Sequence, residues 1–392
     1  MRWSQAAVER AMKFQEVMLR AMSGAISWQA AAEIVGITPR SVLRWRRRYE
    51  QYGWDGLLDR RRRTPSSRAA PFQEVQRILR LYRERFVGFN GRHFHQIARR
   101  EHGVTLSYTF VKRLLQEAGL LRKYRARGRH RRRREPKACF GEMLLVDGSK
   151  HTWLALKPDR QFVLLTFVDD ATKRLVYAQF FESETSKAVL TGLRHVLETH
   201  GLPMALYTDR AGWAAYTPVA GEPPDQRKPT HVGRVLKRLG IEHILSYSPQ
   251  ARGRTERANR TIQGRLVNEL RVAGVRTLAK ANAYLKDRFI ADYNETFGVA
   301  PRDLDSAFVP LGAVDLESIL CHEEERVVGK DNTVVLEGVR LQIAKQRGRR
   351  SCSGLRVLVR RDLQDRHSVW LGTRCLGRYD SDGRPLEEER AA

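Results

Sequence analysis

The amino-terminal 121 residues place apolar side chains about three or four positions apart, which is the spacing of an amphipathic helix. This pattern predicts a first helix over residues 4–22 and a short Ala-rich one that ends at Gly36. A further helix begins at Pro39, behind Thr38, because Thr favours the N-cap and Pro the first helical turn. Helix, tight turn and helix in this order predict a helix-turn-helix module.

A second module repeats this pattern. Its predicted helices cover residues 71–87, 93–103 and 105–119, and Thr105 or Ser107 is the candidate cap of the last one. Two helix-turn-helix domains in tandem read a longer DNA site than one alone. The sequence therefore predicts an all-α, DNA-reading amino-terminal part.

The pattern changes to strands near residue 142. Three β-rich runs, at residues 142–147, 161–170 and 174–181, precede alternating helices and strands that end in a long helix at about residues 252–272. The order βββαβαβα predicts a mixed five-stranded sheet with helices on its faces. The first and fourth strands of this sheet are expected to be neighbours.

The last part of the chain has short alternating runs, which predict a small antiparallel β-barrel. The predicted fold class is therefore multidomain, with all-α helix-turn-helix modules, an α/β core and a small β-barrel. The predicted divisions are a helix-turn-helix domain at 1–58, a basic linker at 59–70, a second helix-turn-helix domain at 71–121, a basic linker at 122–138, the α/β core at 139–300, a linker at 301–324 and the barrel at 325–385.

Composition adds the class of partner. The chain has 392 residues, with 72 Lys and Arg against 44 Asp and Glu, and residues 1–138 hold 33 basic and 11 acidic side chains. A basic excess in that part indicates a polyanion such as DNA. No apolar run of about 18 residues suggests a membrane span, and the four cysteines lack metal-ligand spacing. We therefore expect a soluble, cytoplasmic protein that contacts no membrane.

The amino-terminal residues of each second helix are the candidate DNA contacts. In the first module these are Arg40, Ser41, Arg44, Trp45, Arg47 and Arg48, and in the second they are Ser107, Tyr108, Lys112 and Arg113. The alternative is a helical hairpin with a solvated basic face.

Two other polar features of this region have simpler explanations. Residues 122–134 carry nine Arg or Lys and suit a groove or the DNA backbone, with a localisation signal as the alternative. His93, His95 and His102 lack a Cys or carboxylate at ligand spacing, which favours packing or phosphate contact over a metal.

Three carboxylates end elements of the predicted sheet. Asp147 ends the first strand, Asp209 ends the fourth, and Glu256 lies near the start of the long helix. If they converge, a divalent cation must offset their repulsion, and hard oxygen ligands select Mg²⁺ or Mn²⁺. Two such ions suit in-line phosphoryl transfer on DNA. The alternative is that the aspartates merely end strands and Glu256 pairs with Arg252 or Arg260 on its own helix.

The segment SPQARGRTERANRTIQGRL, residues 248–266, resembles the last motif of DDE transposases and retroviral-type integrases. Its Glu256, Arg257, Asn259 and Thr261 match that motif, and GEMLLVDGSKHTWL, LYTDRAGW and LVNELR resemble the ISNCY-like insertion-sequence transposases. The resemblance covers residues 25–300. It implies a ribonuclease-H-like core in which Asp147, Asp209 and Glu256 are catalytic and hold two Mg²⁺ or Mn²⁺ ions. It also implies that the terminal barrel holds DNA or a partner subunit.

One departure from the family pattern lies between the last two carboxylates. They are separated by 46 residues, more than in many relatives, and Asp-Arg-Ala replaces the usual Asp-Asn-Gly. The extra residues are rich in Pro and Gly, which predicts a bulging loop. Arg210 is a candidate ion-pair partner of Asp209.

Other polar residues around this site have an expected role. A positive rim for the DNA backbone is expected from the arginines of the long helix, namely Arg252, Arg254, Arg257, Arg260 and Arg265. Asn259 is expected to hydrogen-bond DNA or the loop. Trp153 and Trp213 stack on a base or belong to the core. Asp169 is assigned to a turn, and Glu182 and Glu184 to capping the next helix with the help of Ser183 or Thr185.

The resulting hypothesis is a bacterial-type DNA transposase near the nucleoid. It binds the terminal inverted repeats of a mobile element as a homodimer or higher homo-oligomer, then cuts double-stranded DNA and joins it to a target. The alternatives are a catalytically dead DNA-binding regulator and an RNA-processing nuclease of the same core fold. Tandem helix-turn-helix modules suit B-form grooves, which argues against RNA.

Overall fold

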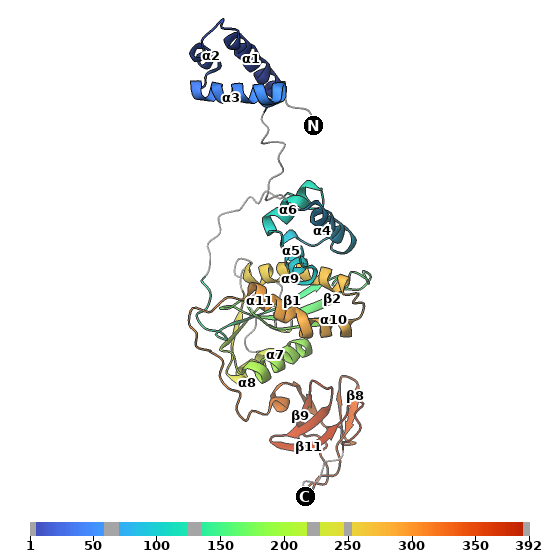
Figure 1. Ribbon diagram of the computed structural model, residues 1–392. Helices are drawn as coiled ribbons and strands as arrows, with labels where there is room; N and C mark the ends of the chain where they lie inside the picture. The colour runs from blue at the N-terminus through green and yellow to red at the C-terminus, as the bar shows by residue number, and fades with distance from the viewer. Residues whose placement is uncertain (1–4, 59–69, 124–134, 218–227, 247–252, 387–392) are drawn as a thin grey trace. The chain divides into compact units, whose positions relative to one another are not determined.

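The computed structural model describes residues 5–58, 70–123, 135–217, 228–246 and 253–386 (Figure 1). The chain forms two compact units, Met1–Arg77 and Ile78–Ala392. The described helices include none that is both long and apolar enough to cross a membrane.

The first unit is built from three helices, α1 (Gln5–Met22), α2 (Trp28–Val35) and α3 (Pro39–Tyr52), followed by the 3-10 helix η1 (Gly53–Leu57). Thr38 caps α3 by accepting a hydrogen bond from the Ser41 backbone, and Pro39 begins the helix. The tight turn before it uses Gly36 at a φ of 74°, a left-handed conformation that glycine adopts without strain. The predicted helix-turn-helix order is confirmed.

The second module consists of α4 (Phe72–Arg85), α5 (Gly91–His102) and α6 (Tyr108–Glu117), and α4 spans the boundary between the two units. Of the two predicted caps, Ser107 is the one used, since its hydroxyl accepts from the Phe110 backbone. Phe86, Phe94 and Leu115 form the centre of its apolar core. The three predicted helices are present.

The central sheet is mixed and five-stranded, as predicted. Its order is β3-β2-β1-β4-β5, in which β1 pairs antiparallel with β2 and parallel with β4. The expected pairing of the first and fourth strands is therefore confirmed. The strands are β1 (Leu144–His151), β2 (Phe162–Asp169), β3 (Leu175–Phe181), β4 (Ala205–Thr208) and β5 (Glu242–Leu245).

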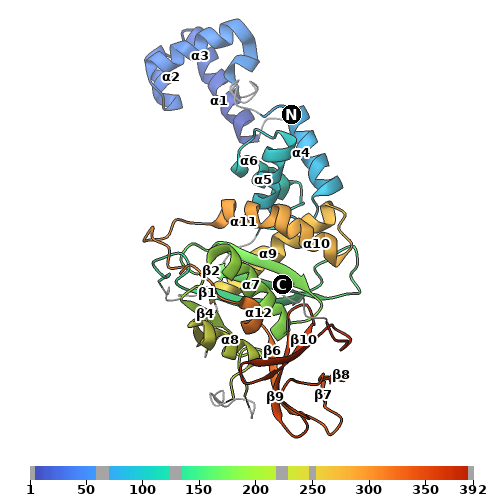
Figure 2. The same ribbon diagram turned by 90° about the horizontal axis from the view of Figure 1, so that it is seen from below.

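Helices cover both faces of this sheet (Figures 1 and 2). Because side chains alternate along a strand, Leu144 and Val146 pack against α7 (Ser186–His200) and α8 (His231–Leu239) on one face. Leu145 packs on the other face against α9 (Gly253–Val272) and the helices that follow it. The position of α9 over β1 decides which strand residues meet the long helix.

The last predicted helix of the core is interrupted. It forms α10 (Leu278–Tyr284), a π-helical turn η4 (Leu285–Phe289) and α11 (Ile290–Phe297). Its buried residues, Ala281, Leu285, Phe289 and Tyr293, recur every four positions. That interval exceeds the period of about 3.6 residues in an α-helix, and one wider turn keeps all four on the sheet.

The predicted linker at 301–324 is partly structured. Val309 pairs with Leu202, Phe308 lies against the glycine at 141, and the short helix α12 (Leu316–Ile319) precedes a strand that begins at His322. Phe308 and Leu311 pack on the core and hold this segment there, although the Pro and Asp residues around them are typical of a linker.

The carboxy-terminal strands do not close a barrel, which corrects the prediction. In the described part of the chain, the sheet runs β11-β10-β9-β6, and β7 pairs only with β8. Short alternating strands look alike in open and closed sheets, so the pattern alone did not decide closure. The strands are β6 (His322–Val327), β7 (Thr333–Leu336), β8 (Val339–Gln342), β9 (Arg356–Arg361), β10 (His367–Leu371) and β11 (Arg374–Tyr379).

Candidate active site

The strand register brings two of the three predicted carboxylates together. Leu145 of β1 lies beside Tyr207 of β4 in the parallel ladder. Two residues further along are Asp147, which lies within β1, and Asp209, which directly follows the last residue of β4. Because neighbouring strands lie about 4.8 Å apart, the two aspartates belong to neighbouring segments of the chain at this part of the sheet.

Helix α9 supplies the third carboxylate from above the same face. Asn259 donates its Nδ2 to Asp147 Oδ2 at 2.6 Å, and Gln263, one turn on, donates to Ser149 Oγ at 2.8 Å. Glu256 precedes Asn259 by three residues, which puts it on the same side of the helix, and its side chain is exposed. Asp147 does not end its strand as predicted, because β1 continues to His151, and α9 contacts β1 at Asp147 and at Ser149.

The three carboxylates are not one compact ligand set. Among the described residues, the group of three whose potential ligand atoms all lie within 4.8 Å of one another is His231, His322 and Glu324. As placed, Asp147, Asp209 and Glu256 therefore do not all lie within reach of a single ion.

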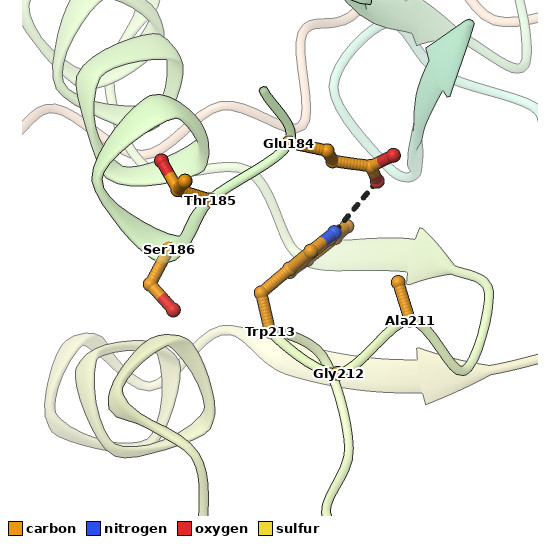
Figure 3. A pocket seen from close by; sticks show the side chains of 6 residues that line it. All are labelled: Glu184, Thr185, Ser186, Ala211, Gly212 and Trp213. Atoms are coloured by element: carbon orange, nitrogen blue, oxygen red, sulfur yellow. Dashed lines mark hydrogen bonds between the residues drawn. The ribbon is translucent and has the colours of Figure 1, made fainter. Parts of the chain in front are cut away.

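A fourth carboxylate, from Glu184, lies beside these residues. A Cβ added at Gly148 would come within 2.4 Å of its Oε2, so Gly148 makes room for it next to Asp147. Glu184 also accepts a hydrogen bond of 2.7 Å from the Trp213 indole (Figure 3). The two side chains line an open pocket of about 400 Å³, together with residues 185, 186, 211 and 212.

The capping role predicted for Glu184 belongs to its neighbour. Thr185 is the N-cap of α7 and accepts from the Ala188 backbone at 3.1 Å. Sequence analysis missed the position of Glu184 because the run of Glu, Ser and Thr resembles a cap. The sequence signal that could have located it is Gly148, directly after Asp147, because a glycine within a strand marks a place where another group approaches the backbone closely.

The other acidic pair has a structural role. Asp169 is fully buried and accepts hydrogen bonds from the Gly141 backbone and from the backbone and hydroxyl of Thr172. Burial raises the pKa of Asp169, and these donors oppose that shift. The contacts agree with the turn assigned to Asp169. Asp170 accepts from Arg254 Nη1 at 2.5 Å.

Fewer arginines than predicted are available for a positive rim around the site, because several of them contact the protein itself. Arg254 pairs with Asp170, Arg257 donates to the Gly253 carbonyl, and Arg265 is buried and donates to Gln96. Arg260 is exposed. Arg252 lies outside the described residues. Asn259, expected at DNA or the loop, instead contacts Asp147.

The candidate contacts of the first module divide into two groups. Arg40, Arg44 and Arg47 are exposed along one side of α3. Ser41 is within 2.9 Å of the Thr38 hydroxyl as part of the cap, and Trp45 packs on Phe14. Arg48 lies over the Trp45 ring.

The second module divides in the same way. Lys112 and Arg113 are exposed, and Arg113 is 3.7 Å from Glu117. Ser107 serves as the cap, and Tyr108 is half-buried beneath Arg92.

The remaining tryptophan and histidines pack internally. Trp153 is fully buried and donates to the Ser149 carbonyl, which gives it the core role of the two that were considered. His93 lies 2.8 Å from Glu269 of α9, and burial lowers the pKa of His93. His95 bonds the Leu106 carbonyl. The His93 contact and the Arg265 contact fasten the second module to α9.

Comparison with known proteins adds two kinds of similarity. A helix-turn-helix domain family matches residues 15–64, and a homeodomain-like domain family matches residues 41–115. The y4bF protein of Sinorhizobium fredii, named as a transposase, is 29% identical over 348 residues, which are 88% of this chain and 75% of that protein. The transposase for insertion sequence IS1202 of Streptococcus pneumoniae is 28% identical over 67% of this chain and 63% of its own length.

Solved structures give a weaker similarity. The HTLV-2 integrase catalytic core domain, solved with magnesium, matches 37% of this chain and 82% of its own at 16% identity and a TM-score of 0.28. A simian T-cell lymphotropic virus intasome chain matches 79% of this chain and 99% of its own at 14% identity and a TM-score of 0.33. The curated relatives are transposases and the matched domains are helix-turn-helix domains, and together with the motif around Glu256 they support a DDE-type insertion-sequence transposase.

Proposed function

We propose that this transposase cuts the ends of a mobile element and joins them to target DNA at Asp147, Asp209 and Glu256. The observation that supports this proposal is the β1–β4 pairing, which makes the strand that carries Asp147 a neighbour of the strand that precedes Asp209. The bond from Asn259 to Asp147 supports it, because it ties the helix that bears Glu256 to the strand that bears the first aspartate.

The donor set fits two Mg²⁺ or Mn²⁺ ions. Three carboxylates offer hard oxygen ligands, and Glu184 adds a further negative charge beside Gly148. Bound ions would lower the pKa of a water or 3′-hydroxyl and stabilise the departing oxygen. Asn259 contributes by fixing one oxygen of Asp147, which leaves the orientation of that carboxylate defined before any ion binds.

The DNA-binding part of the proposal rests on exposed basic side chains. Arg40, Arg44 and Arg47 on α3, and Lys112 on α6, face solvent on the last helix of each module. We propose that these helices read the terminal inverted repeats. The domain divisions from 1–58 through 325–385 belong to the same proposal, as does a homo-oligomer that holds two ends at once near the bacterial nucleoid.

Metal-dependent nicking of duplex DNA that carries the element's ends tests the catalytic assignment. Asp147→Asn should slow nicking roughly a thousandfold, since metal stabilisation is worth several kcal/mol and about 1.4 kcal/mol is tenfold. Asp159→Asn, an exposed aspartate in the loop after β1, is the matched control and should nick at the wild-type rate. Equal nicking by wild type and Asp147→Asn contradicts the proposal.

A further inference from the structure

A second group of potential metal ligands lies away from the carboxylates. His231 is the first residue of α8, and His322 and Glu324 belong to β6. One ligand atom from each of the three lies within 4.8 Å of the others, and the two imidazole ring centroids are 3.7 Å apart. Residues 91 positions apart in sequence thus converge where the catalytic core meets the carboxy-terminal sheet.

The spacing within this group suits a tetrahedral ion. His322 Nε2 is 3.4 Å from Glu324 Oε1. Ligands about 2.0 to 2.1 Å from a tetrahedral zinc are about 3.3 Å from one another. The Nδ1 atom of His322 is buried, and the described residues offer it no hydrogen-bond partner. The Nδ1 atom is therefore left available as a ligand.

The charges around the group permit a cation. The positive charge of Arg234 acts on both histidines and would oppose a cation, but Arg234 pairs with Glu323 at 2.9 Å. Arg326 pairs with Oε2 of Glu324, which leaves Oε1 facing His322, and Arg361 pairs with Glu337. The local arginines thus have carboxylate partners.

We propose that His231, His322 and Glu324 bind one zinc ion that clamps α8 to β6. Two imidazole nitrogens and one carboxylate are a zinc donor set, whereas magnesium prefers oxygen alone. All three side chains are half-buried, so an ion can enter and keep a water as its fourth ligand. His231 is also the last residue of the Pro- and Gly-rich stretch that lengthens the interval between Asp209 and Glu256. The clamp fixes the end of that stretch.

Metal content of the full-length, tag-free protein tests this site. After incubation with zinc and dialysis into magnesium buffer, wild type should retain about one zinc per chain. His231→Gln and His322→Gln should each weaken zinc binding by at least about tenfold. Cobalt(II) in place of zinc should give the intense visible absorption of a tetrahedral site, which both variants lose.

Two controls separate this site from the catalytic one and from misfolding. His195→Gln, an exposed histidine on α7, should keep zinc, and so should Asp147→Asn, whether or not its nicking is impaired. Circular dichroism checks that the His variants fold. The proposal is overturned if folded wild type retains neither zinc nor cobalt, or if His231→Gln and His322→Gln retain as much as wild type.

Discussion

Helices α3 and α9 are both rich in arginine, yet the structure uses their arginines differently. On α3, the side chains of Arg40, Arg44 and Arg47 extend into solvent. On α9, Arg254 is paired with Asp170 and Arg265 is buried. Helix α3 therefore presents positive charge to solvent, whereas two arginines of α9 make contacts that stabilise the fold.

The cause of this difference is what each helix packs against. Helix α3 lies in a small three-helix unit whose contact side is apolar, centred on Val42, Trp45 and Tyr49. Helix α9 lies on a sheet whose strand ends carry carboxylates. A guanidinium near a buried carboxylate pairs with it, because the unpaired charges would be costly. Arginine density alone therefore does not identify a DNA-binding face.

The largest expected effect tests the structural side of this comparison. Arg254→Ala removes the guanidinium partner of the buried Asp170 and should lower the free energy of unfolding by about 3 kcal/mol. Urea unfolding of the full chain, followed by tryptophan fluorescence, measures it. Arg257→Ala on the same helix is the control and should change stability by no more than about 0.5 kcal/mol, since Arg257 is exposed and donates to the Gly253 carbonyl of its own helix. Equal losses in both variants would contradict a specific role for the Arg254 pair.

A second effect concerns the polar side of α9 that faces β1. Asn259→Ala frees one oxygen of Asp147 and should reduce nicking about thirtyfold, within the range for residues that orient metal ligands. Half-maximal nicking should also require more magnesium, which a general loss of stability would not produce. Gln263→Ala, one turn along, removes a bond to a hydroxyl and should leave the magnesium requirement unchanged.

Much of this architecture was predictable from sequence, because the period of the apolar positions and the helix caps are local properties. Thr38, Pro39 and the strand order βββαβαβα fixed the helix-turn-helix and the pairing of β1 with β4 in advance. Partners distant in sequence were not predictable. The contact between His93 and Glu269, and that between Glu184 and Trp213, depend on packing between elements. The prediction of a closed barrel was wrong for the same reason, because pairing between the edge strands of a sheet leaves no local pattern in the sequence.

The smallest effect tests the exposed side of the comparison. Arg44→Ala should weaken binding of the full chain to duplex DNA roughly tenfold, since a hydrogen bond to a charged group contributes about 1.5 kcal/mol. It should also lower the slope of log affinity against log salt by about 0.9, the value for one phosphate contact. Arg46→Ala is the matched control, because Arg46 already pairs with Glu50 at 2.7 Å. Its slope should stay close to that of wild type. If both variants shift the slope equally, pairing within the helix does not decide which arginines reach DNA, and the contrast between α3 and α9 loses its physical basis.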